Sequence, residues 1–356
     1  MTPFLALVAS ALVPLVVCST MRGWVLGKNA QEAPARDRAL HRFRRSTFFV
    51  GALAISCASV AGALSADAAF VARWGILGVW FLSSLCLVTA WVAVALSQRT
   101  GADAEAMSWW ETLGRAVQTS SVVVAATGAA TAILMTMGPA LPLPAPAAAF
   151  LAAILCVIAV SIVSPWLMIV LGIWPMFRAR IEVDGVSWRL AHLPAPNPFL
   201  THVAAMPWLR AVLLTDGVLK RMPERYWRTL VEFEVTESKS SRIERLQRWL
   251  IAFPLSMIVF AGAAAAGAGD PRKLVAGVTL AVGFAFVVTW IANRQGARHI
   301  AMDHVGPSPR ELAQTLRHLP PTYGQAMPPT SHKPLGSALY DRLFALGHDP
   351  GPRRPR

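Results

Sequence analysis

The sequence predicts an α-helical integral membrane protein of about seven spans that carries a small cytoplasmic α+β domain. The first observation is composition: of 356 residues, 55% are hydrophobic and 15% are charged, against roughly a quarter charged in an average soluble domain. The second is that the apolar residues gather in runs of about 20, the length of a helix that crosses a bilayer. The third is a polar segment, 176–249, with both strand and helix patterns.

The apolar runs define the spans and, with them, the domain organisation. The candidate spans are 3–20, 46–66, 74–97, 118–140, 147–175, 250–269 and 274–292. The chain thus divides into a five-span region (1–175), a cytoplasmic segment (176–249), a two-span hairpin (250–292) and cytoplasmic C-terminal helices with a basic tail (293–356). Because the spans hold almost no ionisable side chain, an ion-coupled transporter is disfavoured, whereas a passive channel stays open.

The strong positive charge, +14 in total, is explained by membrane orientation rather than by nucleic-acid binding. Lys and Arg lie mainly in loops beside apolar runs, and loop 21–45 alone holds seven of them against two acidic residues. Cytoplasmic loops carry this excess, so we expect a multi-pass protein of the cytoplasmic membrane with its N-terminus outside and its C-terminus in the cytoplasm. Arg272 and Lys273 fall on the outer side and are the exceptions.

The polar segment shows recognisable strand and helix signals. In "RIEVDGVSWRL" (180–190) an Asp-Gly pair separates two alternating runs, which predicts a β-hairpin. Residues 211–214 read as a buried strand. A helix is expected from Glu224 to about Arg248, with Pro223 at its start. Further helices are expected at about 308–319, entered through "GPSPREL", and around 336–346.

Four blocks of the second half occur in an informative order. They are "NPFLT" (197–201), "RAVLLTDGVLKRM" (210–222), "PRELAQTLRHL" (309–319) and "TSHKPLGSALYDRLFAL" (330–346). Together they resemble the HtpX-like and CAAX-prenyl-protease-like membrane zinc metallopeptidases. This resemblance implies that the cytoplasmic α+β domain is zincin-like, with 197–201 as the edge strand that pairs with substrate.

The resemblance also implies where the catalytic residues should lie, and this chain departs from the family there. In the family, a helix carries H-E-x-x-H, whose histidines hold zinc and whose Glu is the general base. Counting from "LTDG" places Phe233 at the first His, Glu234 at the base and Glu237 at the second His. Phenylalanine has no lone pair, so one ligand position is lost.

The third ligand of the family, a Glu followed four residues later by an Asp, is also missing. Three alignments put the Glu at Arg294, Gly296 or His299 and the Asp at Arg298, Ile300 or Asp303. The alignment on His299 and Asp303 is preferred because it keeps the Asp, and none keeps the Glu. Glu237 and His299 alone do not supply the three protein ligands of a catalytic zinc site.

Each of these residues also has an ordinary structural interpretation. Glu234 and Glu237 suit a solvated or salt-bridged helix surface, Phe233 suits a core, and His299 suits a surface or interface. His192 and His202 lie in the strand region and are the candidates for a replacement ligand.

The sequence therefore favours a non-catalytic pseudopeptidase without a cofactor. Its cleft, including Asn197 and Phe199 of the edge segment, would bind an extended peptide or protein partner by adding a strand, which needs no metal. One alternative is an active zinc peptidase with substituted ligands and Glu234 as base. Another is a membrane sensor or transport-associated protein that works through its first five spans. The partners expected are the lipid bilayer and a peptide or protein, and no nucleic acid.

Overall fold

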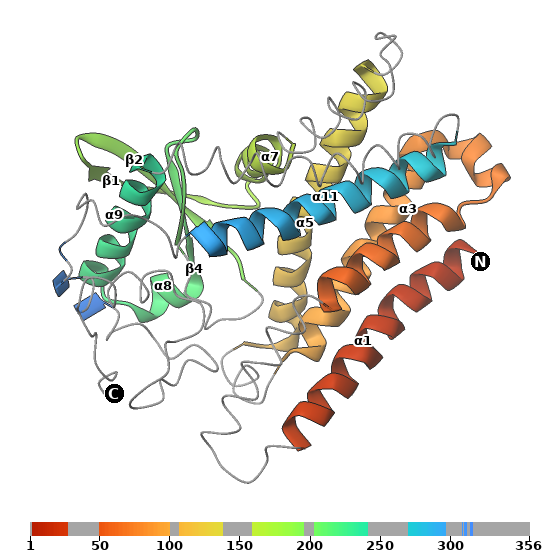
Figure 1. Cartoon of the computed structure of the whole chain (residues 1–356), viewed down its shortest axis with the longest axis horizontal. Coiled ribbons are helices and arrows are strands. Elements are labelled where there is room, and N and C mark those ends of the chain that lie inside the picture. Colours follow the sequence, from red (N-terminus) through yellow and green to blue (C-terminus); the bar gives the residue numbers. More distant parts are fainter. Residues whose placement is uncertain are drawn as a thin grey trace. The chain divides into compact units, whose positions relative to one another are not determined.

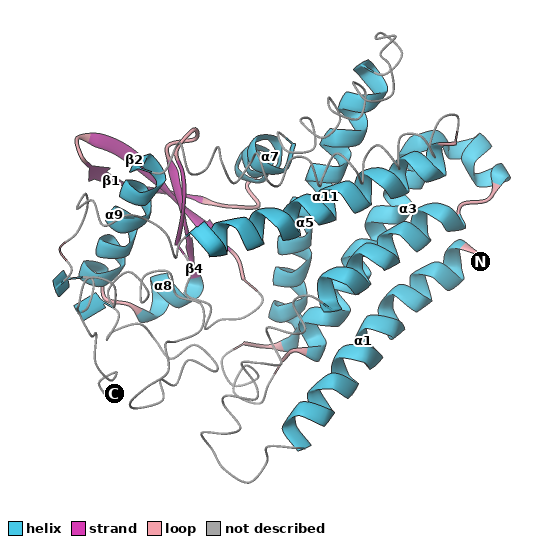
Figure 2. Ribbon diagram, viewed as in Figure 1, coloured by secondary structure: helices cyan, strands magenta, loops and turns pink. Residues whose placement is uncertain are grey.

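The structure is a computed structural model, drawn in Figures 1 and 2. It describes residues 2–27, 50–99, 107–137, 159–195, 203–240 and 270–296, together with 308, 310, 311, 314 and 315. Within these ranges the chain is mostly helical and contains one small sheet. The predicted site residues Asn197, Phe199 and His299 lie outside the described residues, as do His202 and Asp303.

The chain forms two compact units, which are considered separately. The helical unit comprises Met1–Trp24, Phe43–Val170 and Trp249–Thr289, and the sheet unit comprises Val25–Arg42, Leu171–Arg248 and Trp290–Arg356.

The helical unit is built from long apolar helices. These are α1 (Pro3–Gly27), the helix Val50–Ser65, α3 (Ala68–Ser97), α5 (Trp109–Met137), the π-helix η2 (Ala159–Val163), α7 (Ser164–Val170) and most of α11 (Pro271–Gly296). In the described ranges, Pro3–Trp24 and Ala68–Ser97 are long and apolar enough to cross a bilayer, and Val50–Ser65 is a shorter apolar helix. Segment 250–269 lies outside the described residues, and 147–175 is described only from residue 159. The described helices therefore support two spans rather than the seven expected.

Helix α3 begins at a cap and bends within its first two turns. The Asp67 side chain accepts a hydrogen bond of 2.7 Å from the backbone N–H of Phe70, which satisfies a donor at the helix start. Gly75 has φ of 59° and ψ of −157°, outside the helical region. Glycine tolerates this conformation, so the kink lies at the residue best able to make it, near the start of the span expected at 74–97.

Small and hydroxylated side chains line the contacts between these helices. Ser59 of the helix Val50–Ser65 and Ser83 of α3 share a hydroxyl–hydroxyl hydrogen bond of 2.8 Å, and each hydroxyl also reaches the other's backbone carbonyl. One turn along, a Cβ on Gly62 would lie 2.8 Å from Cys86 Sγ. Close approach over small residues and interhelical hydroxyl bonds are typical of helices packed in membranes.

The sheet unit contains four strands in the order β1-β2-β4-β3. The strands are β1 (Met176–Val183), β2 (Val186–Leu193), β3 (Val203–Met206) and β4 (Ala211–Thr215). Strands β1 and β2 form the predicted hairpin, with Val183 opposite Val186. Asp184 and Gly185 have φ of 51° and 70°, as a two-residue type I′ turn requires. Strand β4 confirms the predicted buried strand; it pairs parallel to β2 and antiparallel to β3.

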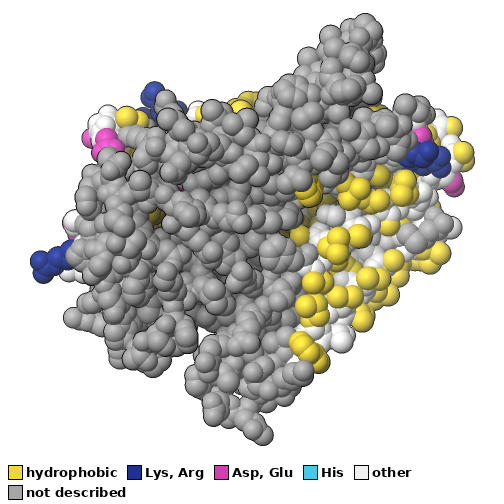
Figure 3. Space-filling view, in the orientation of Figure 1, with side chains coloured by type: hydrophobic (Ala, Val, Ile, Leu, Met, Phe, Trp, Pro, Cys, Tyr) yellow, Lys and Arg dark blue, Asp and Glu magenta, His cyan; other side chains and the backbone are white. Residues whose placement is uncertain are grey.

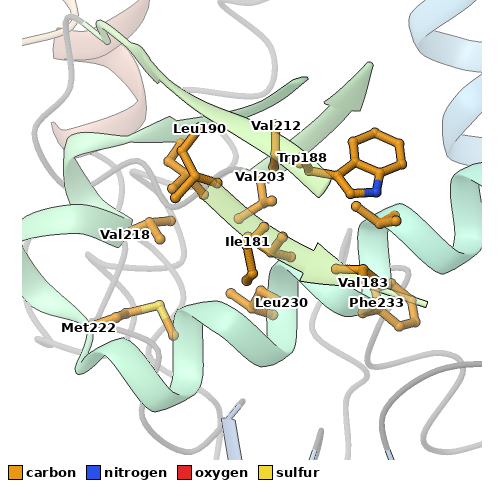
Figure 4. Close-up of a cluster of buried hydrophobic side chains, with 13 residues drawn as sticks. Ile181, Val183, Trp188, Leu190, Val203, Val212, Val218, Met222, Leu230 and Phe233 are labelled. Atoms are coloured by element: carbon orange, nitrogen blue, oxygen red, sulfur yellow. The ribbon is translucent and has the colours of Figure 1, made fainter. Parts of the chain in front are cut away.

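Two helices follow β4 and complete the core of the sheet unit. Helix α8 (Asp216–Arg221) replaces the turn expected after the strand, and α9 (Glu224–Ser240) begins after Pro223, as predicted. Helix α9 packs against the sheet through an apolar stripe. The core comprises Ile181, Val183, Trp188, Leu190, Val203, Val212, Leu214, Val218, Met222, Leu230, Val231, Phe233 and Val235 (Figure 4). Residues 241–248 of the expected helix lie outside the described part of the chain.

Candidate functional site

Helix α9 carries the residues aligned with the zinc-binding motif. The first of them, Phe233, points into the core of the sheet unit. Phe233 is 6% exposed and belongs to the same buried cluster as Val183 and Trp188. Figure 4 shows its ring beside Val183 and below the indole of Trp188. A position enclosed by apolar side chains cannot hold a metal ion or a metal-bound water, because no polar group there replaces the hydration shell that the ion would lose.

The other two motif residues also lie on α9. Glu234 is partly buried, and Glu237 follows three residues later in the same helix. The described residues contain no group of three His, Cys, Asp or Glu side chains placed to hold a metal ion. The structure thus brings Phe233, Glu234 and Glu237 onto one helix, as the alignment requires, without assembling a metal site among the residues it describes.

A second polar feature lies where the parallel strands β2 and β4 end. His192 stands opposite Leu214 in the strand pairing, and its Nε2 lies 3.2 Å from Oδ1 of Asp216. Asp216 is 3% exposed, and Lys220, one turn along α8, places its Nζ 3.5 Å from the same oxygen. A buried carboxylate needs such partners, because an uncompensated buried charge is strongly unfavourable.

The sequence predicts only part of this polar group. It offers His192 as a candidate replacement ligand, and in the structure the Nε2 of His192 lies 3.2 Å from the Asp216 carboxylate. Asp216 and Lys220 were not singled out. The available signal was the spacing in "TDGVLK", where an acidic residue closes a buried strand and a Lys follows four residues later.

The C-terminal segment lies beside α9. Ser308 and Glu311 form a capping box, in which the Glu311 carboxylate accepts from the Ser308 backbone N–H and hydroxyl, and the Glu311 N–H donates to the Ser308 hydroxyl. This agrees with the helix start expected at 308. Arg225 of α9 donates to Gln314 at 3.4 Å, and Thr315 is buried.

Beside this C-terminal segment, the Glu232 carboxyl of α9 lies in a setting that disfavours its charged form. Burial raises the pKa of Glu232, and the negative charges of Glu311 and Asp184 raise it further, while Arg228 lowers it in part. Asp184 belongs to the β1–β2 turn, so the three carboxyls come from three segments. The charges of Glu311 and Asp184 thus add to burial in disfavouring the ionised form of Glu232.

Strand β3 is the terminal strand of the described sheet, opposite the other edge, β1. It begins at Val203, two residues after "NPFLT", and α9 packs against it. An edge strand next to this segment is the position from which a bound peptide could be paired.

Comparison with known proteins adds no relative: no family model, no curated protein and no solved structure matches this chain.

Proposed function

We propose that this chain is a multi-pass membrane protein with a non-catalytic, metallopeptidase-like domain that binds an extended peptide or protein segment on the cytoplasmic side. The proposal has two parts, a membrane-embedded helical unit and a peptide-binding sheet edge, and each part has its own support and its own test.

The membrane part is supported by which side chains the helical unit exposes. On α1 and α3 the large apolar residues point outward, among them Phe4, Leu12, Val16, Leu77 and Phe81, each more than half exposed. Figure 3 shows hydrophobic side chains spread along this face. Water would disfavour so large an apolar patch, whereas acyl chains would cover it.

The alternating direction of the helices is supported by which of their ends lie together. Arg22, near the end of α1, donates to the carbonyl of Arg99, just after the end of α3, so these two ends lie together. At the other end, Arg272 at the start of α11 donates to the Ala66 carbonyl between Val50–Ser65 and α3, at 3.4 Å. The helices thus alternate in direction, as the expected topology requires.

Arg272, which the topology places on the outer side, has its charge compensated locally. Its Nε and Nη2 donate to the two oxygens of Asp270, both at 2.9 Å. These hydrogen bonds hold the pKa of the Asp270 carboxyl below its usual range. A paired arginine contributes little net charge to the loop, which reduces the conflict with the positive-inside rule.

The membrane part is tested by labelling single cysteines with a membrane-impermeant maleimide, in a background without the four native cysteines. Thr2→Cys should react in intact cells. Arg310→Cys should react only after the membrane is opened. Equal labelling of both positions in intact cells would rule out the proposed topology.

The peptide-binding part rests on one observation, the terminal position of β3 directly after residues 197–201. Strand addition uses backbone groups at a sheet edge and requires no metal. The loss of a ligand position at Phe233 therefore removes catalysis without removing binding. Asn197 and Phe199 would contact the side chains of the bound segment.

The test selects peptides from a random library on the detergent-purified full chain and then N-methylates the backbone amides of a selected peptide one at a time. If the peptide adds a strand, methylation of alternate amides should abolish binding, because every second amide faces the sheet. Binding should also be lost when 197–201 is replaced by Gly-Ser repeats and kept in Arg178→Pro, which alters the opposite edge strand β1. Binding that survives methylation at every position would exclude strand addition.

A further inference from the structure

Two arginines meet at one end of the helical unit, where α1 and α3 come together. Arg22 Nη1 donates to the backbone carbonyl of Arg99, and Arg99 Nη2 donates to the carbonyl of Met107, which begins the next described segment. Each guanidinium has five N–H donors, so both keep several after these bonds. The Nε of Arg99 is buried and has no acceptor among the described residues.

Among the described residues, no carboxylate offsets this pair of charges. Within the part of the chain that the structure describes, neither Arg22 nor Arg99 has an acidic side chain within ion-pairing distance. By contrast, Arg115 on α5 is bonded to Glu111 at 3.2 Å, and Arg272 at the other end is bonded to Asp270. The two arginines therefore form a local excess of positive charge with donors that suit an anion.

Two further observations identify the surroundings of the pair as a lipid interface. Trp109 and Trp110 lie two and three residues after Met107, are 49% and 64% exposed, and stack with ring centroids 3.7 Å apart. Tryptophans gather at the depth of the lipid headgroups. On α1, Trp24 lies two residues after Arg22 and is 63% exposed, so exposed indoles stand at the end of α1 as well as at the start of α5.

We propose that Arg22 and Arg99 bind the phosphate of an anionic phospholipid in the cytoplasmic leaflet, with the apolar part of the lipid beside the exposed indoles of Trp24, Trp109 and Trp110. This inference rests on the membrane placement proposed above. A free phosphate would use the same arginines but would leave the exposed indoles uncovered, which is why a lipid is favoured.

The experiment measures lipid binding to the detergent-purified full chain by native mass spectrometry. The probes are dioleoyl phosphatidylglycerol, dioleoyl phosphatidylcholine and inorganic phosphate. We expect one tightly bound phosphatidylglycerol per chain, weaker phosphatidylcholine, and no displacement of the lipid by millimolar phosphate. Arg22→Gln and Arg99→Gln should each weaken phosphatidylglycerol binding about tenfold, the loss expected for one charge-assisted contact.

Two variants guard against a folding artefact. Arg73→Gln removes an exposed arginine near the start of α3 that lies over the Trp74 ring. It should not change the affinity for phosphatidylglycerol. Arg22→Lys keeps the charge but loses the planar fork, so its affinity should lie between those of the wild type and Arg22→Gln.

Three results would overturn the proposal. Wild-type affinity in both Gln variants would show that the arginines do not hold the lipid. Displacement by inorganic phosphate would make the site a phosphate site. Binding that appears only in the double variant Asp103→Asn/Glu105→Gln would show that these two acidic residues of the chain itself occupy the arginines. Failure of the membrane placement is separate, because it would appear in the cysteine labelling and not in these titrations.

Discussion

In the sheet unit, the least exposed side chains include Val212, Leu214 and Trp188, and Asp216 is the buried charged residue among those described. In the helical unit, small side chains such as Ala6, Ala63, Ala90, Ser59 and Ser83 are buried together with Val79, Leu87 and Met168, whereas many Phe, Leu, Val and Trp side chains are exposed. The first pattern is that of a core formed by the hydrophobic effect in water. The second is expected where the solvent is itself apolar and close packing replaces that effect. The two units thus differ in the solvent to which their surfaces are suited.

The largest effect on stability that tests this comparison comes from replacing a phenylalanine by alanine in each unit. Phe233→Ala should destabilise the sheet unit by about 3–5 kcal/mol, because it empties a volume inside the core. Phe81→Ala, on the 64% exposed Phe81 of α3, leaves no cavity and should cost well under about 1 kcal/mol. Amide hydrogen exchange in the detergent-purified chain measures both stability losses, through β2 and β4 for Phe233→Ala and through α3 for Phe81→Ala. Equal losses of protection would contradict the difference between the two surfaces.

A smaller effect concerns the close packing of the helical unit. In Gly62→Ala the added Cβ would lie 2.8 Å from Cys86 Sγ and 3.2 Å from the Leu82 carbonyl. The helices must separate, so a loss of about 1–3 kcal/mol is expected. Gly114→Ala on α5 is the matched control, because its Cβ would meet no atom within 4 Å. Thermal denaturation followed by circular dichroism compares the two. A stable Gly62→Ala would mean that these helices are not closely packed.

The sequence predicted the sheet unit better than the helical unit, for reasons visible in particular residues. Asp184 and Gly185 specify their turn, and Pro223 marks the start of α9, because these are local effects. The number of spans was not predictable to the same degree, since it depends on where helices begin and end within long apolar stretches. The kink at Gly75 illustrates this: nothing in the apolar run marks it.

The candidate site was predicted unevenly for a different reason. That α9 carries Phe233 and Glu234 follows from counting along the chain. The pairing of His192 with Asp216 joins residues 24 positions apart through a parallel strand pair, and the sequence does not reveal which strands will be neighbours. The contact between the segment at Ser308 and α9 is equally non-local.

A still smaller effect is expected from pH. The raised pKa of Glu232 means that the folded state binds this proton more tightly than the unfolded state. Its ionisation therefore costs stability as pH rises through the raised pKa, and the cost is absent below the ordinary Glu value. Glu232→Gln should thus stabilise the sheet unit slightly at pH 7 and have no effect at acidic pH. Urea unfolding followed by β2 and β4 hydrogen exchange at both pH values would detect this. A Gln variant less stable than the wild type at pH 7 would contradict the repulsion from Glu311 and Asp184.

The last prediction concerns zinc, for which no effect is expected. Metal analysis of the detergent-purified protein by mass spectrometry should find far less than one zinc per chain in the wild type, and the same in Glu237→Ala and Glu234→Gln. The physical reason is the burial of Phe233 among apolar side chains, which leaves the first ligand position of α9 without a donor atom. About one zinc per chain, lost in Glu237→Ala, would instead mean that other side chains complete the site. The alternative of an active peptidase would then be favoured, and Glu234→Gln would be expected to keep the metal while losing hydrolysis, because a general base acts on the metal-bound water without holding the ion.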